Sequence, residues 1–154
     1  MERMHATAVD VAGRGVLLCG PSGAGKSDLA LRLVDRGASF ISDDQIELTL
    51  HRRGVLAVAP RPIRGYMEVR GVGIIPVPVT GGTYISLIVE LVPSVDVLRL
   101  PDMEHKMLLG KKIPLIRLNA FEVSTPIKIE LAAGDASRIG RAGPDEQTDG
   151  LERN

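Results

Sequence analysis

The sequence has little cysteine, few aromatic residues and no net charge. Its 154 residues include one Cys, no Trp, two Tyr and two Phe, with 19 basic and 19 acidic side chains. A single cysteine excludes an internal disulfide framework and a multi-cysteine zinc site, which favours the cytosol. A balanced charge lacks the broad positive field typical of nucleic-acid binding, and scarce aromatic residues disfavour base stacking. We therefore expect no nucleic-acid partner.

Long apolar runs are also absent. No segment approaches the roughly 18 apolar residues of a membrane span, and no long apolar stretch follows Met1–His5 as in a secretory signal. We therefore expect a cytoplasmic protein with no membrane contact. What is present, 44% hydrophobic and 25% charged residues, is typical of a globular chain with one core. We expect one domain over residues 1–133 and a flexible tail over 134–154, which is rich in Gly, Ala, Asp, Arg and Glu.

Short apolar runs and glycine turns predict an α/β domain with a mixed sheet and flanking helices. Leu29, Ala30, Leu33 and Val34 form one apolar stripe of a helix that ends before Gly37. A second helix should follow Ser124, with Pro126 in its first turn. A short helix over 102–109 should end at Gly110. The predicted strands are 7–12, 16–19, 39–42, 45–50, 55–59, several within 67–92, and 113–118.

A glycine-rich loop carries the strongest functional motif. Residues 20–27 match the pattern G-x-x-x-x-G-K-[ST] at every fixed position, after an apolar strand and before a helix. Glycines let backbone N–H groups face phosphate oxygens, a lysine can bridge phosphates, and a Ser hydroxyl can bind Mg²⁺. We predict a nucleotide-phosphate site formed by Gly20, Pro21, Ser22, Gly23, Ala24, Gly25, Lys26 and Ser27.

Two further segments could complete such a site. Asp43 and Asp44 follow a predicted strand, so they either form an acidic turn or lie at the strand ends where ligands bind. Glu68 and Arg70 lie two residues apart, on one face of a strand that then meets two glycines. Exposed strand charges are the plain interpretation, whereas buried ones would need each other or a ligand.

Four segments together resemble a known family. They are His5, the phosphate loop 20–27, the pair Asp43-Asp44, and Glu-Val-Arg-Gly-Val-Gly-Ile-Ile at 68–75. The chain is similar over residues 5–133 to the catalytic domain of HPr kinase/phosphorylase, which phosphorylates a serine of the phosphocarrier protein HPr and regulates the phosphotransferase system. It is similar to a short form without the N-terminal domain of longer members. The resemblance implies a P-loop core of the phosphoenolpyruvate-carboxykinase-like kind.

The resemblance also implies roles for individual residues. It makes Asp44 the base for the substrate serine, with His5, Lys26, Arg70 and Arg99 as further catalytic residues. Ser27 and Glu68 would hold Mg²⁺, and ATP would be the phosphoryl donor. HPr would be the protein substrate, and the protein would form a homo-oligomer, which is a hexamer in longer members.

Departures from the family pattern leave other readings open. Pro21 stands where the family usually has an acid, and residues 113–118 keep only part of a segment tied to dephosphorylation. The reverse reaction, phosphorolysis of phospho-HPr, is therefore left open. One alternative is another P-loop kinase or ATPase, in which Glu90 after Leu87–Val89 supplies the carboxylate. A second is a regulatory sensor that binds ATP without turnover on HPr.

Overall fold

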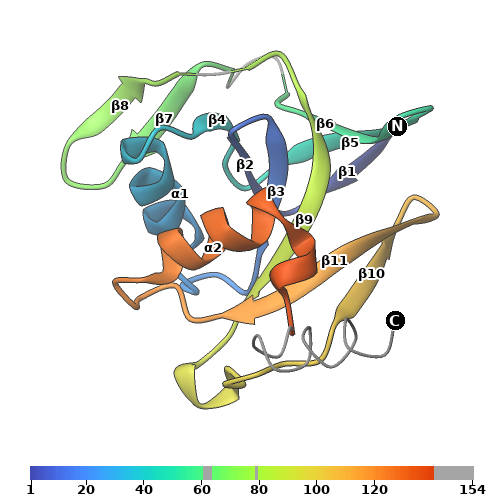
Figure 1. Cartoon of the computed structure of the whole chain (residues 1–154). Helices are drawn as coiled ribbons and strands as arrows, with labels where there is room; N and C mark the ends of the chain where they lie inside the picture. The colour runs from blue at the N-terminus through green and yellow to red at the C-terminus, as the bar shows by residue number, and fades with distance from the viewer. Residues whose placement is uncertain (61–63, 79, 141–154) are drawn as a thin grey trace, which may run out of the picture.

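The computed structural model describes residues 1–60, 64–78 and 80–140. Strands predominate along these residues, with one α-helix after the third strand and a second after the last strand (Figure 1). The strands are β1 (Glu2–Met4), β2 (Thr7–Val11), β3 (Arg14–Cys19), β4 (Ser39–Ser42), β5 (Ile46–His51), β6 (Gly54–Val58), β7 (Tyr66–Val69), β8 (Gly73–Pro76), β9 (Thr83–Leu91), β10 (Glu104–Leu108) and β11 (Lys111–Leu118). The helices are α1 (Lys26–Asp35) and α2 (Thr125–Gly134), with 3-10 turns η2 (Ser94–Asp96) and η3 (Ala136–Arg138).

Most of the strands form one mixed, curled sheet. Its order is β1-β5-β6-β9-β3-β2-β4, with β11 also on β9 and β10 outside β11. The pairs β3–β9 and β9–β11 are parallel, and the others in this sheet are antiparallel. Strand β9 is shared: β6 pairs with its first residues, Thr83 and Tyr84, and β11 with its last four. The mixed α/β architecture expected from the sequence is confirmed.

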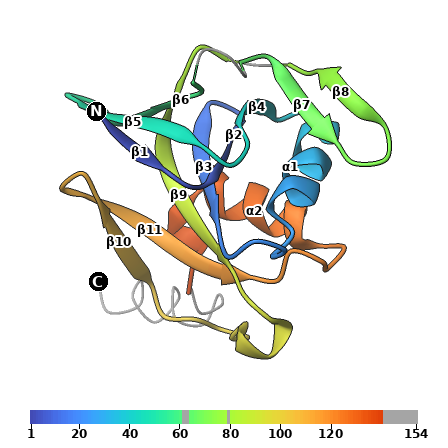
Figure 2. The same ribbon diagram turned by 180° about the vertical axis from the view of Figure 1, so that it is seen from behind.

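The central strands are buried on both faces, because apolar residues occupy successive positions. In β3, Val16 and Leu18 belong to the core beneath α1 and α2, whereas Leu17 belongs to the core on the other face. Strand β9 divides in the same way, with Leu87 and Val89 on the helix side and Ile88 opposite. Figure 2 shows α1 and α2 on one side of these strands and β1, β5 and β6 on the other. Successive side chains of a strand alternate in direction, which produces this division.

Strand direction brings several loops to one edge of the sheet. Strands β3, β9 and β11 are parallel. Strand β4 is antiparallel to β2, and β2 is antiparallel to β3, so β4 also runs in the direction of β3. The segments that follow these four strands (20–25, 92–103, 119–124 and 43–45) therefore leave the sheet at the same edge. Ligands of open α/β sheets bind at such carboxyl ends.

Strands β7 and β8 form a separate two-stranded sheet. Met67 of β7 is buried in the helix-side core, while Tyr66, Val72 and Ile74 are exposed. A backbone hydrogen bond of 2.8 Å from Phe40 N to the carbonyl of Pro78 links this hairpin segment to β4. Buried Met67, the partly buried Val69 and Val77 that pack on the same core, and this backbone bond therefore hold the hairpin against the main body.

The prediction of a short helix over residues 102–109 is wrong. Residues Glu104–Leu108 form strand β10, which pairs antiparallel with β11. Leu109 and Gly110 have φ of 47° and 82°, as a two-residue hairpin turn of the type I′ kind requires. Glu, Lys, Met and Leu are good helix formers, so local propensity favoured a helix and pairing with β11 overrode it.

The carboxyl-terminal helix agrees with the sequence in position but not in its cap. Ser124 precedes α2, yet its side chain makes no capping hydrogen bond. The hydroxyl of Thr125 instead donates to the carbonyl of Asn119, which ties the helix start to the loop after β11. Residues 136–138 of the predicted tail form η3, and residues 141–154 lie outside the described residues. The boundary at residue 133 stays a prediction.

Candidate functional site

The phosphate-binding motif lies between β3 and α1. Gly25 precedes the helix with φ 94°, and Lys26 is its first residue. The Lys26 side chain is 8% exposed, and its Nζ donates to the carbonyls of Gly20 at 2.6 Å and Pro21 at 3.0 Å. These bonds fold the lysine back over the loop. The cation and the amino end of α1 thus face the same small space, which suits an anion.

Position 25 requires glycine because its backbone is left-handed and because neighbouring side chains leave no room for a Cβ atom. A Cβ atom there would lie 2.8 Å from Cβ of Ala120 and 3.1 Å from the ring of Phe121. Both neighbours belong to the loop after β11, at the same sheet edge. Arg32 of α1 braces this loop by donating to the carbonyls of Ala120 and Glu122. The phosphate motif therefore rests against a fixed wall.

Asp43 lies directly beside the phosphate motif. Its Oδ2 accepts a hydrogen bond of 2.6 Å from the hydroxyl of Ser27, and its Oδ1 accepts one of 2.7 Å from the hydroxyl of Thr7. Both donors are neutral, so the carboxylate keeps its negative charge for a cation. The sequence pointed to Asp43 as one of an acidic pair but assigned it no role, and it gave no signal for Thr7.

Asp44 turns its side chain towards the amino-terminal segment. Its Oδ1 lies 2.9 Å from Nε2 of His5. Both side chains are mainly exposed to solvent. Asp44 has φ 75°, a left-handed conformation that Asp and Asn adopt more readily than other non-glycine residues. This backbone turn points the two neighbouring carboxylates to different partners, Ser27 for Asp43 and His5 for Asp44.

Three carboxylates line one cavity of about 370 Å³, those of Asp43, Asp44 and Glu68. Phe40, Tyr66, Met67 and Ile74 supply its other walls. Oxygen donors of this kind, with the Ser27 hydroxyl, suit a hard divalent cation such as Mg²⁺. Among the described residues, no group of three or more His, Cys, Asp or Glu is arranged to hold a metal alone. A cation here would take further ligands from phosphate oxygens and water, as Mg²⁺ commonly does.

Two predicted catalytic residues, Arg70 and Arg99, do not line this cavity. Arg70 is exposed in the turn between β7 and β8, and Arg99 is exposed in the loop after β9. Neither makes an ion pair with another residue in the described ranges. The structure thus gathers His5, Lys26, Ser27, Asp44 and Glu68 around the phosphate motif and the cavity, and it shows no ion-pair partner for either arginine among the described residues.

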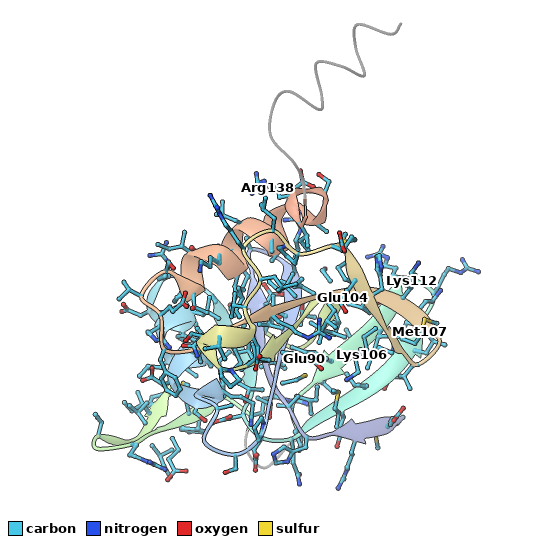
Figure 3. The ribbon with its side chains drawn as sticks, turned by 90° about the horizontal axis from the view of Figure 1, so that it is seen from below. Glu90, Glu104, Lys106, Met107, Lys112 and Arg138 are labelled. Atoms are coloured by element: carbon cyan, nitrogen blue, oxygen red, sulfur yellow. The ribbon has the colours of Figure 1, made fainter. Side chains whose placement is uncertain are left out.

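A second acidic position at the same edge is arranged differently. Glu90, the alternative carboxylate, stands beside Cys19 of β3 and Arg117 of β11 in the strand register. Its Oε2 lies 3.0 Å from Nε of Arg117, which also pairs with Glu104. Glu104, chiefly through its hydrogen bond, raises the pKa of Arg117. Figure 3 shows Glu90, Glu104 and Lys106 in the same part of the molecule.

No helix in the described parts of the chain is long and apolar enough to cross a membrane.

The chain is similar in sequence to a known protein family. The sequence model of the HPr serine kinase C-terminal domain matches residues 1–134. The chain is 38% identical over 139 residues to an HPr kinase/phosphorylase of Limosilactobacillus reuteri, covering 82% of this chain and 41% of that protein. It is 45% identical over 96 residues to that of Latilactobacillus sakei, covering 57% and 31%. The chain thus spans about two fifths of the length of the first of these curated relatives.

A solved structure is similar over nearly its whole length. The HPr(Ser) kinase/phosphatase from Coxiella burnetii aligns with a TM-score of 0.78 and 28% sequence identity. The alignment covers 90% of this chain and 97% of that one. The curled mixed sheet with two helices is therefore a fold that this chain shares with a known structure.

Proposed function

Because the chain belongs to the family of the HPr serine kinase C-terminal domain, we propose that it transfers a phosphoryl group from ATP to a serine of HPr. The observation that carries this proposal is the contact of Ser27 with Asp43 at 2.6 Å, with Asp44 and Glu68 on the same cavity. Phosphoryl transfer needs positive charge on the phosphates and a carboxylate for the nucleophile. Both lie at this edge of the sheet.

Lys26 and the loop 20–25 would bind the phosphates of the nucleotide. The Lys26 ammonium lies over the loop through its bonds to Gly20 and Pro21 and can exchange these carbonyls for phosphate oxygens. Ser27, Asp43 and Glu68 would hold Mg²⁺, which when bound neutralises charge on the β- and γ-phosphate oxygens. Asp43 is added here to the pair that the sequence assigned, because it contacts Ser27 directly.

Asp44 would act as the base. Its carboxylate takes the hydroxyl proton of the substrate serine while that oxygen attacks the γ-phosphorus, and ADP leaves with the bridging oxygen. His5 contacts Oδ1 of Asp44 and so holds the carboxylate with Oδ2 available for the serine. Arg70 and Arg99 would supply positive charge to the transferred phosphoryl group, in the catalytic roles that the resemblance implies. Phosphorolysis would be the same chemistry reversed and is left open.

The alternative with Glu90 as the essential carboxylate has less support. Arg117 lies 3.0 Å from Glu90 and compensates its charge, whereas Ser27 of the phosphate motif bonds to Asp43. A magnesium-binding carboxylate should face the motif serine with its charge available. Asp43 meets this description better than Glu90.

The proposal also covers the cellular location and the assembly of the protein. We place the reaction in the cytoplasm, where HPr would be regulated as part of the phosphotransferase system. We further propose a homo-oligomer, a hexamer by resemblance to longer members of the family. Light scattering at micromolar concentration checks this assembly, and a monomer mass would contradict it.

The experiment that tests the function is a direct phosphotransfer assay. Purified protein is incubated with HPr from the same organism, ATP and Mg²⁺, and HPr is analysed by intact mass and phosphosite mapping. We expect one phosphate on a serine, its absence with Lys26→Met, and its retention with Lys112→Met, an exposed lysine of β11. Unmodified HPr despite measurable ATP binding would overturn the proposal in favour of a nucleotide sensor.

A further inference from the structure

Thr7 contacts Asp43 from inside the protein. The side chain is 0% exposed, and its Oγ1 donates a hydrogen bond of 2.7 Å to Oδ1 of Asp43. Asp43 therefore has two hydroxyl partners of different character. Thr7 is sealed from solvent on one carboxylate oxygen, and Ser27 is exposed on the other.

The position of Thr7 in the sheet makes this contact rigid. Strand β2 lies between β3, which leads into the phosphate motif, and β4, which leads into Asp43. Thr7 pairs with Leu18 of β3, and the next residue, Ala8, pairs with Ser42 of β4. A hydroxyl at this junction is fixed by the backbone relative to both elements. Because Thr7 is sealed from solvent, water cannot take the place of Asp43 as its hydrogen-bond partner. Loss of this bond would leave the buried hydroxyl unpaired, which is costly.

We propose that Thr7 is a positioning residue that fixes Asp43 so that Oδ2 and the Ser27 hydroxyl face one divalent cation. This inference rests on the proposed use of a metal-bound nucleotide. A neutral donor orients the carboxylate without cancelling its charge, whereas a lysine or arginine in the same place would lower its attraction for a cation. The exposed Ser27–Asp43 bond is then the one that opens to the metal.

Binding of Mn²⁺ with ADP, measured by electron paramagnetic resonance without HPr, tests this role. Thr7→Val keeps the shape of the side chain and removes the hydroxyl, so Mn²⁺ affinity should fall about 10- to 100-fold. Thr7→Ser keeps the hydroxyl and should restore binding close to the wild-type value. Metal-free ADP affinity should change little in both variants, because the loop and Lys26 contact the phosphates. A purely structural role would not separate metal from nucleotide in this way.

Thr83 supplies a matched control. It is a buried threonine, 4% exposed, whose hydroxyl has no hydrogen-bond partner within the described ranges. Thr83→Val makes the same chemical change in β9 and should leave Mn²⁺ binding unaltered. Equal Mn²⁺ affinity in wild type and folded Thr7→Val would overturn the inference. If Thr7→Val does not fold, Thr7→Cys, with a much weaker donor of similar size, must show the loss instead.

These measurements separate the inference from the proposed function. Wild-type protein that binds Mn²⁺·ADP but leaves HPr unmodified contradicts the proposed substrate, while the Thr7 variants still decide the positioning role. Wild-type protein that binds no Mn²⁺·ADP overturns both.

Discussion

Two acidic regions lie at the same edge of the sheet, and they differ in what their carboxylates contact. Asp43 follows β4 and accepts hydrogen bonds from the neutral hydroxyls of Thr7 and Ser27. Glu90 ends the apolar part of β9, immediately beside β3, and faces the guanidinium of Arg117. By sheet order alone, Glu90 is closer to the strand of the phosphate motif. The contact partner of an acidic side chain, more than its distance along the sheet from the phosphate motif, therefore indicates its use.

The negative charge in the Glu90 region is compensated by a neighbouring arginine. Arg117 pairs with both Glu90 and Glu104 across three neighbouring strands. Such a row of alternating charges stabilises a sheet edge modestly and attracts little further charge. The Asp43–Asp44 region has carboxylates on a cavity, and among the described residues the imidazole of His5, rather than a lysine or arginine, lies within ion-pair distance of them. A cation or a substrate proton is therefore drawn to the second region.

The largest expected effect comes from exchanging each acid for its amide. Asp44→Asn should lower kcat for HPr phosphorylation by about 10²- to 10⁴-fold, since it removes the base. Asn tolerates the left-handed backbone at this position, so folding should be preserved. Glu90→Gln should leave kcat unchanged and cost no more than about 1 kcal/mol of unfolding free energy. Steady-state kinetics and urea unfolding measure both.

Asp35→Asn is the control for this comparison, because Asp35 is exposed at the far end of α1. It should behave as wild type. Loss of activity in Glu90→Gln with normal transfer in Asp44→Asn would reverse the assignment of the two regions.

The position of the phosphate motif depends on the close contact between Gly25 and the loop after β11. Gly25→Ala meets Ala120 at 2.8 Å in a left-handed backbone, so we expect a loss of about 2–5 kcal/mol in unfolding free energy. Ser27 should shift away from Asp43, and nucleotide binding should fail, while Glu90 and Arg117 keep their contact. Urea unfolding and calorimetric ADP binding measure these effects.

Gly23→Ala is the matched variant for this change. Gly23 has φ 84° but no atom within 4 Å of an added Cβ, so only backbone strain of about 1–2 kcal/mol applies. Equal losses for the two variants would show that contact with the loop after β11 has no role in holding the motif.

The smallest expected effect concerns Cys19 in the Glu90 region. Burial raises the pKa of its thiol above the ordinary value of 9.0, Lys106 and Lys26 oppose this rise, and Glu90 adds to it. The folded thiol thus keeps its proton where the unfolded thiol loses it. Stability should fall as pH rises from about 9 through the higher folded pKa, by at most about 1.4 kcal/mol per pH unit. Urea unfolding between pH 7 and 10 should show a shallower slope for Cys19→Ala, and parallel slopes would contradict this.

Much of the fold could be predicted because local patterns and pairing agree. The apolar stripe of α1 specifies a helix by its periodicity, and the run from Val16 to Cys19 specifies a buried strand by its short length between two glycines. Strand β10 could not be predicted, because Glu104–Leu108 has the composition of a helix and becomes a strand only through β11. Propensity is a weak signal where a long-range partner decides.

The candidate site also has parts that the sequence predicts and parts that it does not. The phosphate motif and the acidic pair are visible in the sequence because each is a contiguous segment. The contacts of His5 with Asp44, and of Thr7 with Asp43, join residues almost forty positions apart. They arise from the antiparallel pairing of β2 with β4 and β1 with β5. The spacing of residues along the chain does not determine this strand register, so these contacts could not be predicted from the sequence.

The attachment of the β7–β8 hairpin has a consequence for hydrogen exchange. Glu68 lines the cavity from a two-stranded sheet that is attached to the main body by Met67, by the partly buried Val69 and Val77, and by a backbone bond to Phe40. Amides of such a sheet exchange through local opening, at a free energy well below that of global unfolding. Amides of β3 and β9, buried on both faces, exchange only when the whole domain opens. The wall of the cavity with Glu68 therefore belongs to the low-stability part of the domain, whereas Phe40 and Asp43 line it from β4 of the main sheet and the segment that follows β4.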